Sequence, residues 1–143
     1  MRIPAIFLAA VAVAFVAPAT VASANTVKML NKGAAGSMVF ENAIIRVKPG
    51  ESVTFTPDDM GHSVESIPGM LPAGAKPFKG QMNKPLTVTF SKPGVYGFKC
   101  PPHLGMGMVG VVIVGDPVNL TQAKAVSLPG RAKQVMSGLL TRL

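Results

Sequence analysis

One short stretch in the C-terminal half of this sequence gathers most of the side chains that bind soft metal ions. It contains Cys100, the only cysteine of the chain, then His103, Met106 and Met108. The chain has one further histidine, His62, in a distant segment. A site built from one thiolate, two imidazoles and one thioether would therefore use every cysteine and histidine of the protein.

This set of side chains indicates a copper centre. Two imidazoles and one thiolate with a weak axial thioether form the arrangement typical of electron-transfer copper. Cys100 ends an expected strand, and His103 with either Met106 or Met108 fits on the loop that follows, while His62 completes the site from elsewhere. Zinc is the alternative metal, but methionine is a poor fourth ligand for zinc. Two histidines are too few for further copper centres, so the composition predicts one metal ion and no substrate site.

Each of these residues also has an ordinary explanation. A free cysteine is often a small buried residue, and most of the nine methionines must be packing residues or parts of the N-terminal segment. Activation of Cys100 by His103 or His62 would instead indicate a cysteine-dependent hydrolase. A copper carrier that transfers metal would expose several exchangeable ligands, whereas this thiol lies at a strand end. The joint spacing favours a copper centre over the packing explanation, whereas the hydrolase and the copper carrier stay open as alternatives.

The elements that must position these residues are mainly strands. Short apolar segments separated by Gly, Pro and Asn predict an all-β sandwich. In the last part of the segment 95–100, Tyr96, Phe98 and Cys100 fall on one face, which would shelter the thiol in the interior. Residues 57–84 lack periodicity and predict loops, with one short strand or helical turn near 64–67 or 79–82. The expected strands are 26–31, 38–40, 44–48, 52–56, 86–90, 95–100 and 109–114.

The C-terminal tail changes character. Residues 120–126 and 131–140 favour helix, and Pro129-Gly130 separates them. Val135, Leu139 and Leu140 form an apolar stripe on the second helix. We expect this helix to cover the sandwich and to take no part in the chemistry.

The N-terminal segment is typical of an export signal. An apolar run over residues 3–16 is followed by the small residues 22–24, the pattern expected before a signal-peptidase site. We interpret residues 1–24 as a signal peptide that directs the protein to the periplasm, and residues 25–143 as one domain. A membrane anchor is the alternative, but the run is shorter than the roughly 20 residues of a span and Pro18 follows it.

The chain is basic, with a formal net charge of +8. This charge favours acidic partners over basic ones. Positive charge alone does not indicate nucleic-acid binding, because the sequence has an export signal and no recognisable binding motif.

Beyond the ligand spacing, the chain resembles the cupredoxins, a family of small blue copper proteins, over nearly all of residues 25–143. The resemblance implies an eight-stranded Greek-key β-sandwich with two C-terminal α-helices. It also implies one copper ion per chain, alternating between Cu(I) and Cu(II), bound by His62, Cys100, His103 and Met108, and it thereby selects Met108 over Met106. The matching stretches are Met29-Leu30-Asn31-Lys32-Gly33, Met38-Val39-Phe40-Glu41, Gly61-His62, Val64-Glu65-Ser66-Ile67, Lys99-Cys100, Pro102-His103, Met106-Gly107-Met108 and Val114-Gly115-Asp116.

The resemblance further implies a role as an electron carrier and not as an enzyme. The partners it implies are redox proteins: nitrite reductase, nitrous oxide reductase, c-type cytochromes or methylamine-related dehydrogenases. It suggests docking at an apolar patch around His103 that is rimmed by Lys32, Lys79 and Lys99, which would steer an acidic partner. A carrier of this kind is expected to be a monomer.

Two positions depart from the family pattern. Pro101 stands where relatives generally have a polar residue, and Ser63 stands where Asn is common. Both residues adjoin expected ligands, so they are expected to tune the reduction potential without changing the ligand set.

Overall fold

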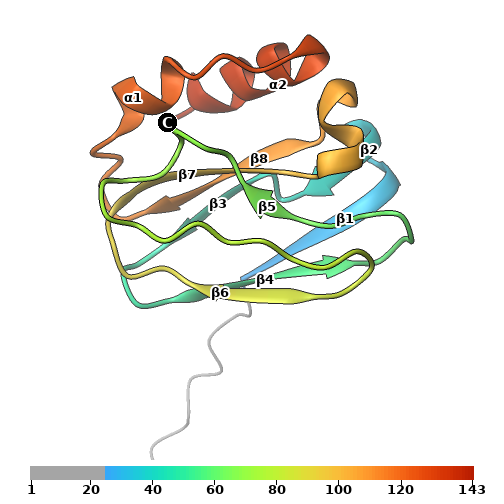
Figure 1. Cartoon of the computed structure of the whole chain (residues 1–143), viewed down its shortest axis with the longest axis horizontal. Helices are drawn as coiled ribbons and strands as arrows, with labels where there is room; N and C mark the ends of the chain where they lie inside the picture. Colours follow the sequence, from blue (N-terminus) through green and yellow to red (C-terminus); the bar gives the residue numbers. More distant parts are fainter. Residues whose placement is uncertain (1–24) are drawn as a thin grey trace, which may run out of the picture.

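Two four-stranded sheets pack face to face in the computed structural model, which describes residues 25–143 (Figure 1). The expected signal peptide, residues 1–24, lies outside the described residues. One sheet has the order β2 (Gly36–Glu41), β1 (Thr26–Gly33), β4 (Ser52–Pro57) and β6 (Leu86–Thr89). The other has the order β3 (Ile44–Val47), β8 (Val109–Val114), β7 (Gly94–Lys99) and β5 (Glu65–Ser66).

The predicted architecture of eight strands followed by two C-terminal helices is confirmed. Strands β1 and β4 pair in parallel, as do β3 and β8, and the remaining pairs are antiparallel. A 3₁₀ helix, η1 (Pro101–Met106), connects β7 to β8, and the C-terminal helices are α1 (Leu120–Lys124) and α2 (Gly130–Leu140). No helix within the described residues is long and apolar enough to cross a membrane.

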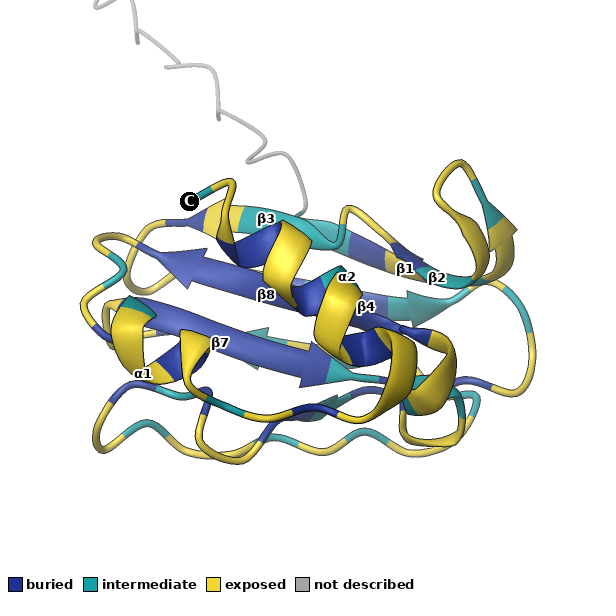
Figure 2. Ribbon diagram, turned by 90° about the horizontal axis from the view of Figure 1, so that it is seen from above, coloured by how far each residue is buried: buried dark blue, intermediate teal, exposed yellow. Residues whose placement is uncertain are grey.

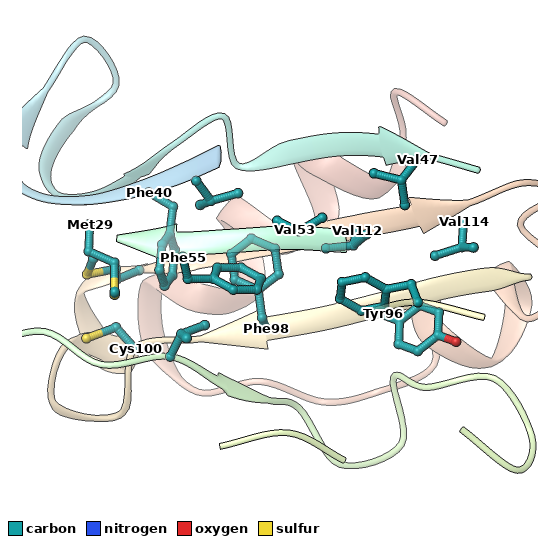
Figure 3. Close-up of a cluster of buried hydrophobic side chains, with 14 residues drawn as sticks. Met29, Phe40, Val47, Val53, Phe55, Tyr96, Phe98, Cys100, Val112 and Val114 are labelled. Carbon is teal, nitrogen blue, oxygen red and sulfur yellow. The ribbon is translucent and has the colours of Figure 1, made fainter. Parts of the chain in front are cut away.

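The inward-facing side chains of β7 and the thiol that follows this strand belong to the same buried core. Tyr96, Phe98 and Cys100 are all buried in the core between the sheets, as their alternation predicts (Figure 3). Phe98 packs edge-on against Phe40 and Phe55, with ring centroids 4.8 and 5.0 Å apart. Edge-to-face aromatic pairs stabilise the core beyond simple burial, so they fix the end of β7 that Cys100 directly follows.

Gly110 allows this packing. A Cβ atom at residue 110 would lie 2.3 Å from Cζ of Phe98 and 2.8 Å from the carbonyl oxygen of Ala43. Only glycine leaves room for the Phe98 ring at this point of β8. The apolar run of β8 is otherwise buried along its whole length, as predicted for an interior strand.

The two helices cover the outer face of β7 and β8 (Figure 2). Leu139 and Leu140 of the predicted stripe are buried, together with Ala132 and Met136, and Val135 is partly buried. They form a second apolar cluster with Val95, Val111 and Ile113 from the outer face of the sheet.

Asn119, which directly precedes α1, connects the C-terminal helical segment to β7 by hydrogen bonds. Its Nδ2 donates to the carbonyl oxygen of Val95 at 2.9 Å, and its Oδ1 accepts the Val95 N–H at 2.6 Å. Both bonds are buried, so the amide satisfies two main-chain groups that water does not reach.

We therefore expect Asn119→Ala to lower the free energy of unfolding by about 3 kcal/mol, because it leaves a buried N–H and a buried C=O of Val95 without partners. Urea denaturation followed by circular dichroism measures the change. Gln134→Ala, at an exposed position of α2, is the matched control and should change stability little. Equal stability of the two variants would contradict the role assigned to Asn119.

Candidate metal centre

His62, Cys100 and His103 converge at one end of the sandwich. Their potential ligand atoms all lie within 4.8 Å of one another. The Sγ atom of Cys100 is 3.7 Å from Nδ1 of His62 and 3.5 Å from Nδ1 of His103. The structure thus brings together the thiol and both imidazoles that the sequence singled out, although 38 residues separate His62 from Cys100.

The connection from β7 to β8 sets the positions of three expected donors. The N–H of Cys100 donates to the carbonyl oxygen of Met108 at 3.0 Å, which closes the loop. Within the loop, the N–H of His103 donates to the carbonyl oxygen of Cys100 at 3.1 Å, and the N–H of Met108 donates to the carbonyl oxygen of His103 at 3.2 Å. Pro101 and Pro102 begin η1, where a fixed φ suits the first helical turn.

The structure separates the two candidate methionines. Met108 is 0% exposed and belongs to the same core cluster as Cys100, whereas Met106 is 50% exposed. The main-chain bonds of the loop join Met108 directly to Cys100 and His103. Burial beside the thiol therefore favours Met108 as the thioether of the site.

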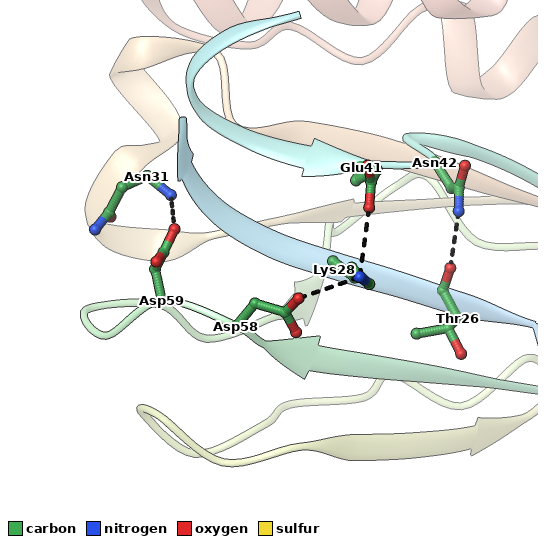
Figure 4. A network of polar contacts seen from close by, with 7 residues as sticks. All are labelled: Thr26, Lys28, Asn31, Glu41, Asn42, Asp58 and Asp59. Atoms are coloured by element: carbon green, nitrogen blue, oxygen red, sulfur yellow. Dashed lines mark hydrogen bonds and ion pairs between the residues drawn. The ribbon is translucent and has the colours of Figure 1, made fainter. Parts of the chain in front are cut away.

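His62 is held by a residue that the sequence reasoning did not identify as functional. Its Nε2 lies 2.9 Å from Oδ1 of Asn31, on β1. Since Oδ1 can only accept, Nε2 carries the proton and Nδ1 turns its lone pair toward the thiol of Cys100. The Asn31 N–H donates in turn to Oδ2 of Asp59 at 2.7 Å (Figure 4). The only sequence signal for Asn31 was its place in a stretch shared with the cupredoxins.

The main chain around His62 is also fixed. The N–H of Gly61 donates to Oδ1 of Asn83 at 2.6 Å, and the N–H of Asn83 donates to the carbonyl oxygen of His62 at 2.8 Å. Gly61 has φ +94°, a conformation that glycine adopts without strain. His62 is thereby fixed both through its ring and through its backbone.

Burial governs the electrostatics of the site. It raises the pKa of the Cys100 thiol, and the main-chain N–H groups of Ser63 and His103 partly oppose this rise. Burial also lowers the pKa of His62; His103 adds to this effect and Asp59 opposes it. A metal cation that binds these groups displaces the thiol proton and compensates the buried thiolate charge.

The donor set fits copper. A thiolate, two imidazoles and a buried thioether are soft or intermediate ligands, and the convergent group contains no carboxylate. A zinc site would call for a fourth strong ligand. The chemistry of the donors therefore agrees with an electron-transfer copper site.

Comparisons with known proteins agree with the fold and the donor chemistry. The family described as copper binding proteins, plastocyanin/azurin family, matches residues 27–115. Pseudoazurin from Paracoccus pantotrophus is 47% identical over 139 residues, which cover 95% of this chain and 96% of that protein. Pseudoazurin from Methylorubrum extorquens is 52% identical over 118 residues, covering 82% and 79%. The structure of native pseudoazurin from Hyphomicrobium denitrificans superposes with a TM-score of 0.81 at 40% identity, covering 85% of this chain and 98% of that one.

The chain therefore belongs to the plastocyanin/azurin family of copper-binding proteins and, within that family, to the pseudoazurins. The resemblance read from the sequence is confirmed, and so is the copper cofactor that it implied. Proteins of this class are one-electron carriers that use a type 1 copper ion. The zinc site and the cysteine-dependent hydrolase are not supported.

We expect Asn31→Ala to lower the affinity for Cu(II) by about tenfold or more, because the His62 ring loses the acceptor that fixes its tautomer and orientation. Competition with a chelator of known affinity measures the change. Asn42→Gly is the matched control, since Asn42 directly follows β2, has φ +61° and donates through Nδ2 to the carbonyl oxygen of Thr26, away from the site. The role of Asn31 would be refuted by equal affinities in the two variants.

Proposed function

We propose that His62, Cys100, His103 and Met108 bind one copper ion, and that the protein carries single electrons between redox proteins of the periplasm. Its partners would be c-type cytochromes or a dehydrogenase as donors and a copper nitrite reductase or similar terminal enzyme as acceptor. The observation that carries this proposal is the convergence of one thiol and two imidazoles within 4.8 Å, beside the buried Met108. When bound, copper supplies a centre that accepts and returns one electron.

The chain's own contribution is a frame that holds the donors in nearly constant positions. The main-chain bonds of the loop from β7 to β8 fix Cys100, His103 and Met108 relative to one another. Asn31 and Asn83 fix His62 independently. Pro101 and Pro102 restrict the backbone of η1 further. A frame of this kind keeps geometric change small when the charge of the centre changes, which favours rapid electron transfer.

The electron would leave through His103. Cys100, His62 and Met108 are each 0% exposed, whereas His103 is only partly buried. Its neighbours on η1 are apolar and lie at the surface. We define the His103 patch as Pro102, His103, Leu104 and Met106, and propose it as the docking surface for the redox partners.

Two lysines would steer acidic partners to this end of the protein. Lys32 and Lys79 are exposed, and neither forms an ion pair within residues 25–143. Lys99 differs, because its Nζ lies 3.3 Å from Oε1 of Glu65 and both side chains are largely buried. Lys99 therefore contributes less to steering than the sequence suggested.

The remaining parts of the proposal concern location and class. We propose that residues 1–24 form an export signal and that residues 25–143 act as a monomeric domain in the periplasm. We further propose that the protein is not an enzyme, because four protein donors would leave no open position on the metal for a substrate.

The ligand set is tested by three variants of the copper-loaded protein. Cys100→Ala should abolish the intense visible absorption with Cu(II), and Met108→Leu should raise the reduction potential, since an apolar side chain stabilises the higher charge of Cu(II) less than a thioether does. Met106→Leu is the matched control for Met108→Leu and should leave both the spectrum and the potential nearly unchanged. The assignment is wrong if Met106→Leu shifts the potential and Met108→Leu does not.

Steering is tested by the salt dependence of electron transfer. The second-order rate constant with an acidic c-type cytochrome should fall steeply as ionic strength rises, and the Lys32→Ala/Lys79→Ala double variant should lower it by about tenfold at low salt. The Lys124→Ala/Lys133→Ala double variant removes the same charge at exposed positions of α1 and α2, and it serves as the charge-matched control. A flat salt profile would remove steering from the proposed function.

A further inference from the structure

Exposed apolar side chains are unevenly distributed over this protein. Among the described residues, the large hydrophobic side chains that are exposed are Met60 (73%), Met82 (47%), Met106 (50%) and Val118 (72%). Three of these four are methionines. Most of the exposed large hydrophobic side chains are therefore thioethers, and this surface composition calls for an explanation.

All three methionines lie beside the metal centre. Met60 precedes His62 by two residues, and Met106 precedes Met108 by two residues on the segment that carries His103. Met82 adjoins Asn83, whose side chain and N–H bond Gly61 and His62. The loop that follows β4 lies at the same end of the sandwich as η1 (Figure 1). Val118 lies elsewhere, beyond the far end of β8.

The other methionines of the described residues are sheltered. Met29, Met70 and Met108 are 0% exposed and Met136 is 3% exposed, while Met38 is partly buried. A reagent in solution thus reaches three thioethers freely. The thioether proposed as a copper ligand is not among them.

We propose that Met60, Met82 and Met106 are modification sites at which hydrogen peroxide oxidises the thioether to a sulfoxide. In this reaction a sulfur lone pair attacks one peroxide oxygen, an S–O bond forms and the O–O bond breaks. The sulfur loses two electrons, and the second oxygen leaves as water after a proton shift. Access to the sulfur selects these three sites, because the oxidation requires direct approach of the peroxide.

The modification changes the surface without touching the metal donors. A sulfoxide is polar, so oxidation makes the surface that Met60, Met82 and Met106 form near the His103 patch polar and hydrated. Docking there must then desolvate the sulfoxide oxygens, which slows electron transfer roughly tenfold. This consequence rests on the proposed function, since it requires that electrons leave through the His103 patch. Methionine sulfoxide reductases would reverse the change.

The test uses the copper-loaded protein and electron self-exchange between its own oxidised and reduced copies, measured by NMR line broadening. Self-exchange needs no other partner, and both copies present the same surface. The protein is treated with hydrogen peroxide, the sulfoxides are located by peptide mass spectrometry, and the rate is compared with that of the untreated sample. The Met60→Leu/Met82→Leu/Met106→Leu triple variant keeps the apolar area but lacks the three thioethers.

We expect sulfoxides at residues 60, 82 and 106, an unchanged blue spectrum, and a rate about tenfold lower than in the untreated protein. Peroxide should leave the self-exchange rate of the triple Leu variant at its own untreated value. Early oxidation of Met29 or Met108, loss of colour, or three sulfoxides with an unaltered rate would overturn the proposal. Failure of the proposed function is distinguishable, because it would show in the untreated protein as absent blue colour or absent self-exchange.

Discussion

The main-chain hydrogen bond from Cys100 to Met108 joins the end of β7 to the start of β8 and closes the loop that carries three of the proposed donors. The two strands pair along their full length, so the sheet fixes both ends of this loop. Because the loop is short and holds a 3₁₀ helix, few other conformations are open to His103. Strand pairing thus sets the positions of Cys100, His103 and Met108.

Burial gives this arrangement its chemical character. An apolar setting is unfavourable for an isolated thiolate or imidazolium, and it correspondingly raises the pKa of Cys100 and lowers that of His62. Without a metal, burial therefore favours the neutral thiol of Cys100 and the neutral imidazole of His62. A bound cation would favour the thiolate, because it compensates the negative charge. The same burial that disfavours the free thiolate therefore favours a bound soft cation.

Much of the fold could be predicted from the sequence because the strands are half buried. Apolar and polar side chains alternate in β4 and β6, and burial alternates with them because only one face of these strands lies in the core. The uniformly apolar run of β8 is buried on both faces. The spacing of Cys100 and His103 was equally readable, since one loop had to carry both. His62 followed only because no other histidine was available.

The features that escaped prediction depend on contacts between distant segments. The two-residue strand β5 lies within residues 64–67, one of the two places where the sequence predicted a short strand or helical turn. Its pairing with β7, Glu65 with Lys99 and Ser66 with Phe98, could not be predicted. The same contact pairs Lys99 with Glu65 and so reduces the charge expected at the surface. Asn31 stabilises His62 across 31 residues of sequence, which no local pattern records. Local periodicity identifies elements, whereas tertiary contacts decide which polar groups are satisfied.

Helix α2 illustrates how a covering element also supports the site. Its expected role as an inert cover describes its apolar face correctly, but the helix also packs against η1. A Cβ atom at Gly107, which has φ +90°, would lie 2.9 Å from Cγ2 of Val135, and one at Gly130 would lie 3.1 Å from the carbonyl oxygen of Gly105. Two glycines thus allow the helix to approach the segment between His103 and Met108 closely. Since close-packed interiors transmit displacement, a shift of α2 would move this segment. Helix α2 therefore restrains the loop that carries the proposed ligands.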